Sequence, residues 1–178
     1  MWNRNKIVFI GLHIIAWLIF VGLSIEAGAL IVNFIFSIFN PDVVHKLYQK
    51  LDLSAMYETN QWIFFSMFSF ILFIAILKAY MFYVVINLLN KFNLEKPFSS
   101  FVSEQIKKIS YFTLSIGLLS YVARQTTKQL PHYGYSIDGL NQFWADSQAY
   151  ILMAAVIYII AVIFAKGVEL QKENDLTI

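Results

Sequence analysis

The chain alternates long apolar runs with short polar stretches, and four of the apolar runs are predicted to be membrane-spanning helices. They cover approximately residues 7–39, 62–90, 109–123 and 149–165. About 20 predominantly apolar residues are needed to cross a hydrocarbon core ~30 Å thick. The pattern therefore predicts an all-α, polytopic membrane protein. We expect its four transmembrane helices to form a bundle in a single domain over residues 1–178, with a cytoplasmic tail at 166–178.

The segment after the first run has apolar residues at helical spacing. Asn40-Pro41 ends the first run, because proline disfavours helix in the residue before it. An apolar series then repeats against Asp42, Lys46, Gln49 and Lys50: Val43, Val44, Leu47, Tyr48 and Leu51. We expect an outer amphipathic helix on the membrane surface, with a solvent-exposed loop as the alternative.

The segment before the third run is also amphipathic. Pro97 and the pair Ser99-Ser100 provide a helix start. One face then carries Phe98, Val102, Ile106 and Ile109, and another carries Glu104, Lys107 and Lys108. This pattern predicts a cytoplasmic amphipathic connector that leads into the third run. That run is the shortest, and its small residues Ser115, Gly117 and Ser120 would allow a neighbouring helix to approach closely.

The distribution of basic residues predicts the orientation. Four spans place both termini on one side, and that side carries eight basic residues: Arg4, Lys6, Lys91, Lys96, Lys107, Lys108, Lys166 and Lys172. The other side carries four: Lys46, Lys50, Arg124 and Lys128. By the positive-inside rule both termini are cytoplasmic. The outer interface would then hold several aromatic residues: Tyr57, Trp62, Tyr133, Tyr135 and Trp144.

Composition narrows the function further. Hydrophobic residues make up 59% of the chain and charged residues only 13%, whereas a soluble domain carries roughly 25% charged residues. A net charge of +2 without a Lys/Arg cluster argues against direct nucleic-acid binding. The chain has no cysteine, and no sequence motif indicates a metal site, a cofactor site or an activated nucleophile. An enzyme is therefore not expected. The 17 phenylalanines are expected to face lipid and neighbouring helices, with a lipophilic ligand pocket as the alternative.

Two charges lie inside apolar sequence, Glu26 in the first run and Lys78 in the second. An ionisable group at the centre of a membrane helix costs about 2.5–3.5 kcal/mol on insertion scales, so such groups usually face protein or water. The helical rise places the two charges at similar depth, and an intramembrane ion pair that pins the two helices together is the leading interpretation. The alternatives are that Glu26 lies at the outer interface, or that the charges form a proton, ion or substrate pathway.

Two stretches resemble a known bacterial membrane family, domain of unknown function 2975 (DUF2975). They are INLLNKFNLEKPFSSFVSEQIKKISYF, residues 86–112, and AVIFAKGVELQKENDLTI, residues 161–178. The resemblance implies a four-span fold in the bacterial cytoplasmic (inner) membrane. It also implies a partner, a small cytoplasmic helix-turn-helix regulator of the Cro/repressor type. It assigns no role to Glu26 or Lys78.

The sequence therefore predicts a regulatory or interaction protein that binds a soluble cytoplasmic partner through its connector and tail. The residues expected to bind this partner are Lys107, Lys108, Glu173, Asp175, Leu176 and Ile178. One alternative is a small transporter, or a binder of lipophilic ligands, that uses Glu26 and Lys78. Another is a structural subunit of a larger membrane complex or oligomer.

Overall fold

The computed structural model describes residues 2–48, 51–94, 96–135, 137 and 139–175, and its regular structure there is entirely helical. The long helices are α1 (Trp2–Phe39), α3 (Gln61–Lys91), α4 (Ser100–Gln129) and α5 (Ser147–Asp175). They are joined by the short α2 (Ser54–Thr59) and by the 3-10 helices η1 (Pro41–Lys46), η3 (Leu130–Tyr133) and η4 (Asn141–Phe143). The predicted all-α class is confirmed.

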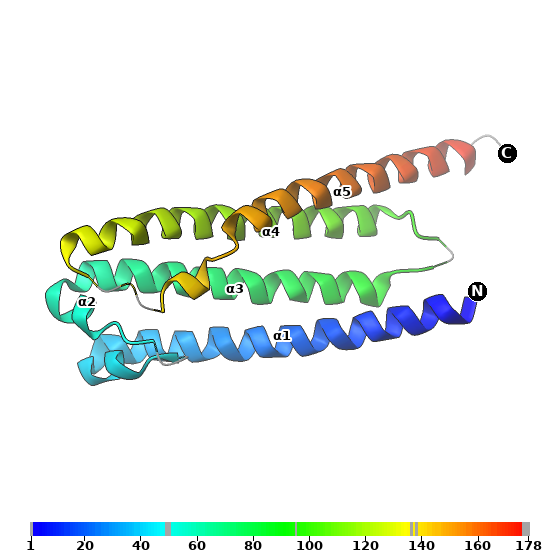
Figure 1. Cartoon of the computed structure of the whole chain (residues 1–178). Helices are drawn as coiled ribbons and strands as arrows, with labels where there is room; N and C mark the ends of the chain where they lie inside the picture. The colour runs from blue at the N-terminus through cyan, green and yellow to red at the C-terminus, as the bar shows by residue number, and fades with distance from the viewer. Residues whose placement is uncertain (1, 49–50, 95, 136, 138, 176–178) are drawn as a thin grey trace.

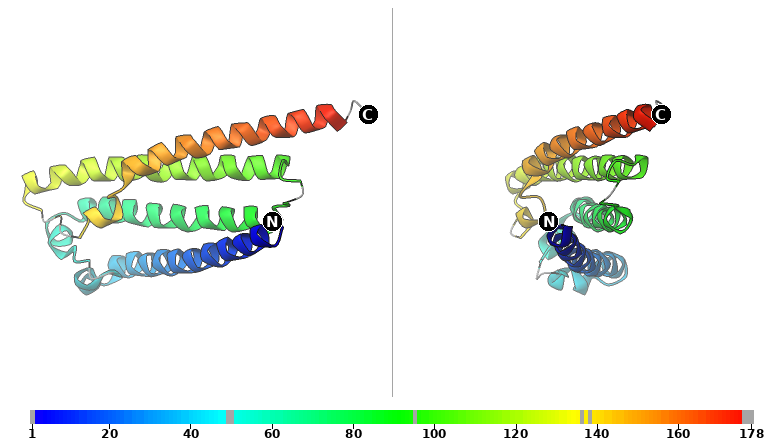
Figure 2. Two further views of the ribbon diagram at one scale, coloured as in Figure 1. Left: turned by 45° about the vertical axis from the view of Figure 1, so that its right-hand side comes forward. Right: turned by 90° about the vertical axis from the view of Figure 1, so that its right-hand side faces the viewer.

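The four long helices lie side by side in an open row and do not close into a bundle (Figures 1 and 2). α3 packs between α1 and α4, and α4 packs between α3 and α5. The start of α1 and the end of α5 lie at the same end of the row (Figure 1). We call this the terminal end and the opposite one the far end.

Three of the four long helices are long and apolar enough to cross a membrane in the described part of the chain. The candidate spans are Lys6–Phe39, Gln61–Lys91 and Asn141–Asn174. The predicted run 109–123 is not a fourth span of this kind but the middle of α4, with Lys107-Lys108 before it and Arg124 after it. At ~1.5 Å per residue that run is about 22 Å long, less than the ~30 Å hydrocarbon core. The apolar helices make the chain compatible with a membrane protein.

α4 buries a face of small and polar side chains. Its buried residues include Gln105, Ser110, Thr113, Gly117, Ser120 and Thr127. The Ser110 hydroxyl donates to the Ala154 carbonyl of α5 at 2.9 Å, and the Ser103 hydroxyl donates to the Ala161 carbonyl at 3.3 Å. These hydrogen bonds satisfy polar groups that lipid could not satisfy, because a hydrocarbon environment offers no hydrogen-bond partner.

The packing of α4 against α5 is closest at Gly117. A Cβ atom at this position would lie 2.8 Å from Ile151 Cγ1 and 2.9 Å from the Ile151 backbone nitrogen. The sequence analysis predicted close approach at Ser115, Gly117 and Ser120, and the structure confirms it at Gly117. Ser120 is buried, whereas the Ser115 hydroxyl donates to the Tyr111 carbonyl of its own helix at 2.9 Å.

The segment after α1 differs from its prediction. α1 ends at Phe39, and the Asn40 side chain accepts the Asp42 backbone N–H at 3.1 Å, as expected for the stop at Asn40-Pro41. Instead of one amphipathic helix on the membrane surface, η1 and α2 fold back over the far end of the row. In these elements and the chain between them, the apolar residues Val44, Leu47, Leu51, Leu53 and Met56 are buried in the protein core. The apolar periodicity was correct, but protein rather than lipid covers it.

Hydrogen bonding also fixes the start of α2. The Ser54 hydroxyl and its backbone N–H both donate to the Asp52 carboxylate, at 2.6 and 2.9 Å. These bonds stabilise the ionised carboxylate and hold the pKa of Asp52 below its usual value.

The main core lies at the far end and is rich in aromatic rings. Phe34 of α1 stacks on Phe68 of α3, with ring centroids 5.4 Å apart, as expected for inter-helix packing of phenylalanine. Of the aromatics predicted at the outer interface, Trp62 and Tyr133 are exposed, with 86% and 76% of their surface accessible. Trp144 is 1% exposed and belongs to the core, so its prediction was wrong. Trp144 belongs to the segment between η4 and α5, and this segment packs against the row of long helices.

The contact at Gly117 predicts opposite effects for the same substitution at two glycines. Gly117→Ala places a methyl group against the α5 backbone, and overpacking of this kind costs about 1–3 kcal/mol. Gly11→Ala is the control, because nothing lies within 4 Å of its Cβ position, and alanine there gains about 1 kcal/mol of helix propensity. Thermal unfolding in detergent should show a lower Tm for Gly117→Ala and an equal or higher Tm for Gly11→Ala. A rise in both would contradict the close packing of α4 on α5.

Candidate functional site

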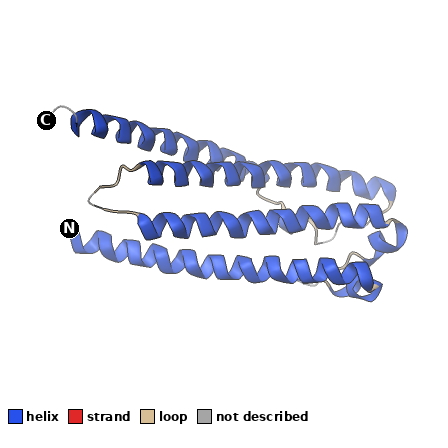
Figure 3. Ribbon diagram, turned by 180° about the vertical axis from the view of Figure 1, so that it is seen from behind, coloured by secondary structure: helices blue, strands red, loops and turns tan. Residues whose placement is uncertain are grey.

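The terminal end of the molecule brings together the segments that the sequence analysis selected. The connector runs from the end of α3 at Lys91 to the start of α4 at Ser100, and the last turns of α5 pass beside it (Figure 3). We define the connector–tail surface as residues 96–109 and 166–175, as far as the structure describes them. It contains part of the predicted partner-binding set.

The connector ends in a capped helix, as predicted from Pro97 and Ser99-Ser100. The Ser99 hydroxyl accepts the backbone N–H of Val102 at 3.2 Å, and the Ser99 carbonyl accepts that of Ser103 at 3.1 Å. Val102 is buried, whereas Lys107 and Lys108 are exposed. The predicted separation of apolar and charged faces is therefore confirmed within α4, whereas Phe98, predicted on the apolar face, keeps 41% of its surface exposed.

The tail is a direct continuation of α5. The helix runs from Ser147 to Asp175, so the predicted boundary at residue 166 does not interrupt it. The centroids of the Phe98 and Phe164 rings lie 5.3 Å apart. The Phe98 ring also covers Gly167 so closely that a Cβ atom on this glycine would collide with the ring. Phe98 thus packs the connector against the tail.

Beyond this contact the last turns of α5 are exposed. Leu170 has 63% of its surface accessible, and Lys172 and Glu173 are exposed as well. The Asp175 side chain, Leu176 and Ile178 lie outside the described part of the structure. Beyond the Phe98 contact, the end of α5 therefore presents one exposed apolar side chain, Leu170, among charged side chains.

Two charged side chains of the connector–tail surface have partners close to them in the sequence. Glu169 pairs with Lys166 on its own helix at 2.5 Å. Lys107 lies over the Tyr111 ring, with 5.8 Å between its Nζ atom and the ring centroid. An exposed ion pair such as Lys166–Glu169 contributes about 0–1 kcal/mol. The connector and the tail are in contact through the packing of Phe98 against Phe164 and Gly167.

The intramembrane charges lie at similar depth but have different surroundings. Phe34 faces Phe68 and Phe20 faces Tyr83, and interpolation between these two pairs places Lys78 opposite Ile25, beside Glu26. Both side chains are half-buried. However, the Lys78 Nζ atom lies 5.8 Å from the centroid of the Tyr150 ring. A cation over an aromatic face is stabilised by the ring quadrupole. Lys78 thus contacts α5, and its pairing with Glu26 stays a prediction.

The histidines are dispersed. His13 lies in α1, where its Nε2 atom accepts the indole N–H of Trp17 at 3.1 Å, and His45 and His132 are exposed at the far end. Within the described residues, no three His, Asp or Glu side chains come together in a way that could hold a metal ion.

Sequence reasoning missed Phe164 and Gly167, which complete the contact with Phe98. Gly167 offers a signal in retrospect, because a glycine inside a helix costs about 1 kcal/mol relative to alanine. At Gly167 the absence of a side chain allows the Phe98 ring to approach the helix closely. The partner ring could not be identified without the structure.

Comparison with known proteins gives one result. A protein-family model described as "Protein of unknown function (DUF2975)" matches residues 48–178, which include α3, the connector, α4 and α5. Searches of curated proteins and of solved structures found no match. Because the family model covers well over half of the chain and includes both stretches that carry the resemblance, the chain belongs to the DUF2975 family.

Proposed function

We propose that the protein is a membrane-embedded interaction protein that holds a soluble partner at its connector–tail surface. The observation that carries the proposal is the contact of Phe98 with Phe164 and Gly167. This contact joins the connector and the tail, which are far apart in the sequence. The end of α5 extends past the contact and is exposed. A rigid helix end beside a capped helix start is a preorganised binding surface, which lowers the entropic cost of association.

The chemistry of the surface suits a protein partner. Leu170 supplies an exposed apolar anchor, and Lys107, Lys108, Lys172 and Glu173 supply charges around it. Protein interfaces commonly combine a small apolar centre with a charged rim. The proposed role is binding rather than catalysis.

Orientation and family suggest where the partner resides and what it is. The excess of basic residues near the terminal end supports a cytoplasmic position for this surface. The family resemblance supports a helix-turn-helix regulator as the partner. A regulator held at the bacterial inner membrane would be kept from its DNA, so the membrane protein would act as an anchor that sequesters it.

A transporter or a binder of lipophilic ligands that uses Glu26 and Lys78 is the alternative. It would require the two charges to face a shared polar space. The contact of Lys78 with the Tyr150 ring gives this lysine a packing role between α3 and α5 instead. We therefore put forward the interaction role.

Removing the end of the tail tests the proposal directly. Deletion of residues 173–178 should abolish capture of the soluble partner while the protein still inserts into the membrane. Affinity purification from native membranes in mild detergent, with mass-spectrometric identification of retained proteins, measures the capture. Membrane fractionation of the same samples measures insertion. Equal capture by the deleted and the full chain would refute the assignment of the tail.

The exposed leucine gives a sharper test at one residue. Burying a leucine side chain stabilises a complex by about 1.5–3 kcal/mol, so Leu170→Ser should weaken partner binding roughly tenfold or more. Tyr133→Ser is the matched control, because it removes an exposed apolar side chain at the far end. Binding of the purified partner to immobilised, detergent-solubilised protein measures both variants. Similar affinities for the two variants would show that Leu170 is not an anchor.

A further inference from the structure

The terminal end also contains a cavity that has no role in the connector–tail surface. It has a volume of about 670 Å³ and lies between the first turns of α1 and the end of α3. The polar residues that line it are Lys6, His13, Asn90, Lys91 and Asn93. Its apolar wall includes Phe9 and Phe92, whose rings stack with centroids 5.0 Å apart.

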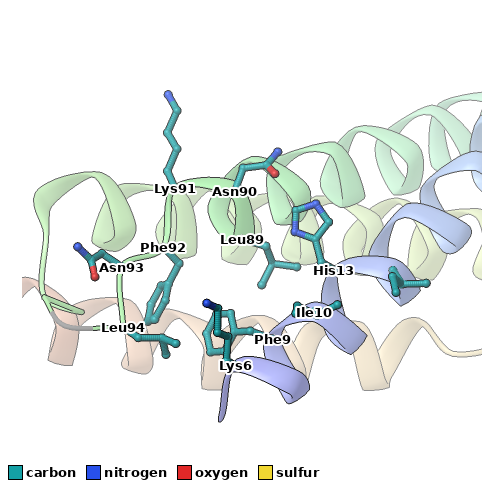
Figure 4. Close-up of a pocket in the computed structure, with 11 residues that line it drawn as sticks. Lys6, Phe9, Ile10, His13, Leu89, Asn90, Lys91, Phe92, Asn93 and Leu94 are labelled. Carbon is teal, nitrogen blue, oxygen red and sulfur yellow. The ribbon is translucent and has the colours of Figure 1, made fainter. Parts of the chain in front are cut away.

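The polar lining can bind an anion. No acidic residue is among the described residues that line the cavity, whereas two lysines are. Figure 4 shows Lys6 and His13 on α1, and it shows that the Lys91 side chain points away from both of them. The Lys91 Nζ atom lies 4.8 Å from the centroid of the Phe101 ring, so Lys6 is the cation that remains for the cavity.

His13 adds a donor of fixed orientation. Its Nε2 atom accepts the Trp17 indole N–H, so Nδ1 carries the proton of the neutral ring. The cavity therefore combines an ammonium group, an imidazole N–H and the Asn90 amide. These donors match the oxygen atoms of a phosphate group.

The cavity lies at the depth of a membrane interface. On α1 the polar start of the chain changes to continuous apolar sequence directly after Lys6, and on α3 the apolar sequence ends at Asn90-Lys91. Both candidate spans thus begin or end at the cavity. Basic pockets between transmembrane helices at this depth are typical sites for anionic lipid headgroups.

A second hollow, an apolar groove of about 490 Å³, lies further along the same face of α1 and α3. On α1 the cavity and groove residues follow one another at helical spacing: Lys6, Ile10, His13, Phe20, Ser24, Ala27 and Ile31. On α3 the same holds for Ile76, Ala79, Tyr83 and Asn90. Trp17 lies between the two parts in the sequence, donates to His13 of the cavity and packs on Phe20 of the groove with ring centroids 5.8 Å apart.

The dimensions fit one phospholipid. Half of the ~30 Å hydrocarbon core is about 15 Å, which corresponds to roughly ten helical residues. Counted from His13, this length reaches Leu23 and Ser24 in the groove. Small residues make the groove hollow there: Ser24, Ala27, Gly28 and Ala79. We propose that the cavity and groove together bind an anionic phospholipid, with its phosphate at Lys6, His13 and Asn90 and an acyl chain along α1 and α3.

Two substitutions separate the headgroup site from the chain site. Lys6→Gln removes the cation, and each basic residue near an anionic lipid surface strengthens binding about fivefold. Gly28→Leu fills the groove, and its Cβ position has no atom within 4 Å, so the helices need not move. The matched controls are Lys128→Gln at the far end and Gly22→Leu, whose Cβ position is equally open but does not line the groove.

Native mass spectrometry of the purified full chain measures the bound lipid. The detergent should contain equal amounts of phosphatidylglycerol and phosphatidylcholine with identical acyl chains. We expect the unmodified protein to retain phosphatidylglycerol preferentially. Lys6→Gln should lower this preference about fivefold, and Gly28→Leu should lower the retention of both lipids. Lys128→Gln and Gly22→Leu should behave like the unmodified protein, and all five proteins should have similar Tm values.

Several outcomes would overturn the proposal. Equal retention of the two lipids by the unmodified protein would show that no headgroup site exists. An equal loss of phosphatidylglycerol preference in Lys6→Gln and Lys128→Gln would show that this preference comes from general surface charge. Unchanged retention in Gly28→Leu would remove the acyl chain from the groove. Displacement of the lipid by millimolar glycerol 3-phosphate would indicate a site for a small anion instead of a lipid. Partner capture through Leu170 is independent of each of these results.

Discussion

The polar, closely packed face of α4 is the constraint on which the rest of the structure depends. Ser103 and Ser110 donate to carbonyls of α5, and Gly117 lies against the α5 backbone. Lipid could neither accept those hydrogen bonds nor fill the space at Gly117 as closely. α4 must therefore lie between two other helices, and α3 and α5 occupy these positions. The apolar α1 has no such requirement and lies at the edge of the row (Figure 2).

The same hydrogen bonds set the register of α5 and thereby create the candidate interaction surface. Because Ser103, near the start of α4, is level with Ala161, the residues that follow Ala161 reach the connector and then pass it. Phe98 lies on Gly167 at the point of passage. The exposed end of α5 is thus a consequence of the register of α4 and α5.

The position of α1 at the edge has a different consequence. α1 packs on α3 along a narrow stripe, and most of its apolar side chains remain exposed. Small residues along that stripe leave an apolar groove between α1 and α3. The cavity at Lys6 lies nearer the terminal end on the same two helices. The family match begins at residue 48 and does not include α1, so the proposed lipid site combines an element outside the matched region with one inside it.

The sequence by itself determined the helical class, the compatibility with a membrane, the family and the ends of several helices. These properties are local: Asn40-Pro41 stops α1 and Ser99 caps α4, whatever surrounds them. The amphipathic faces of the connector were also local, and Val102 and Lys107 lie as predicted. Only the tertiary structure decided that the helices form a row, that Trp144 is buried, that Lys78 contacts Tyr150, and that Phe98 lies on Gly167. Each of these joins residues distant in sequence, and an apolar pattern shows that a face must be covered without showing whether lipid or another helix covers it.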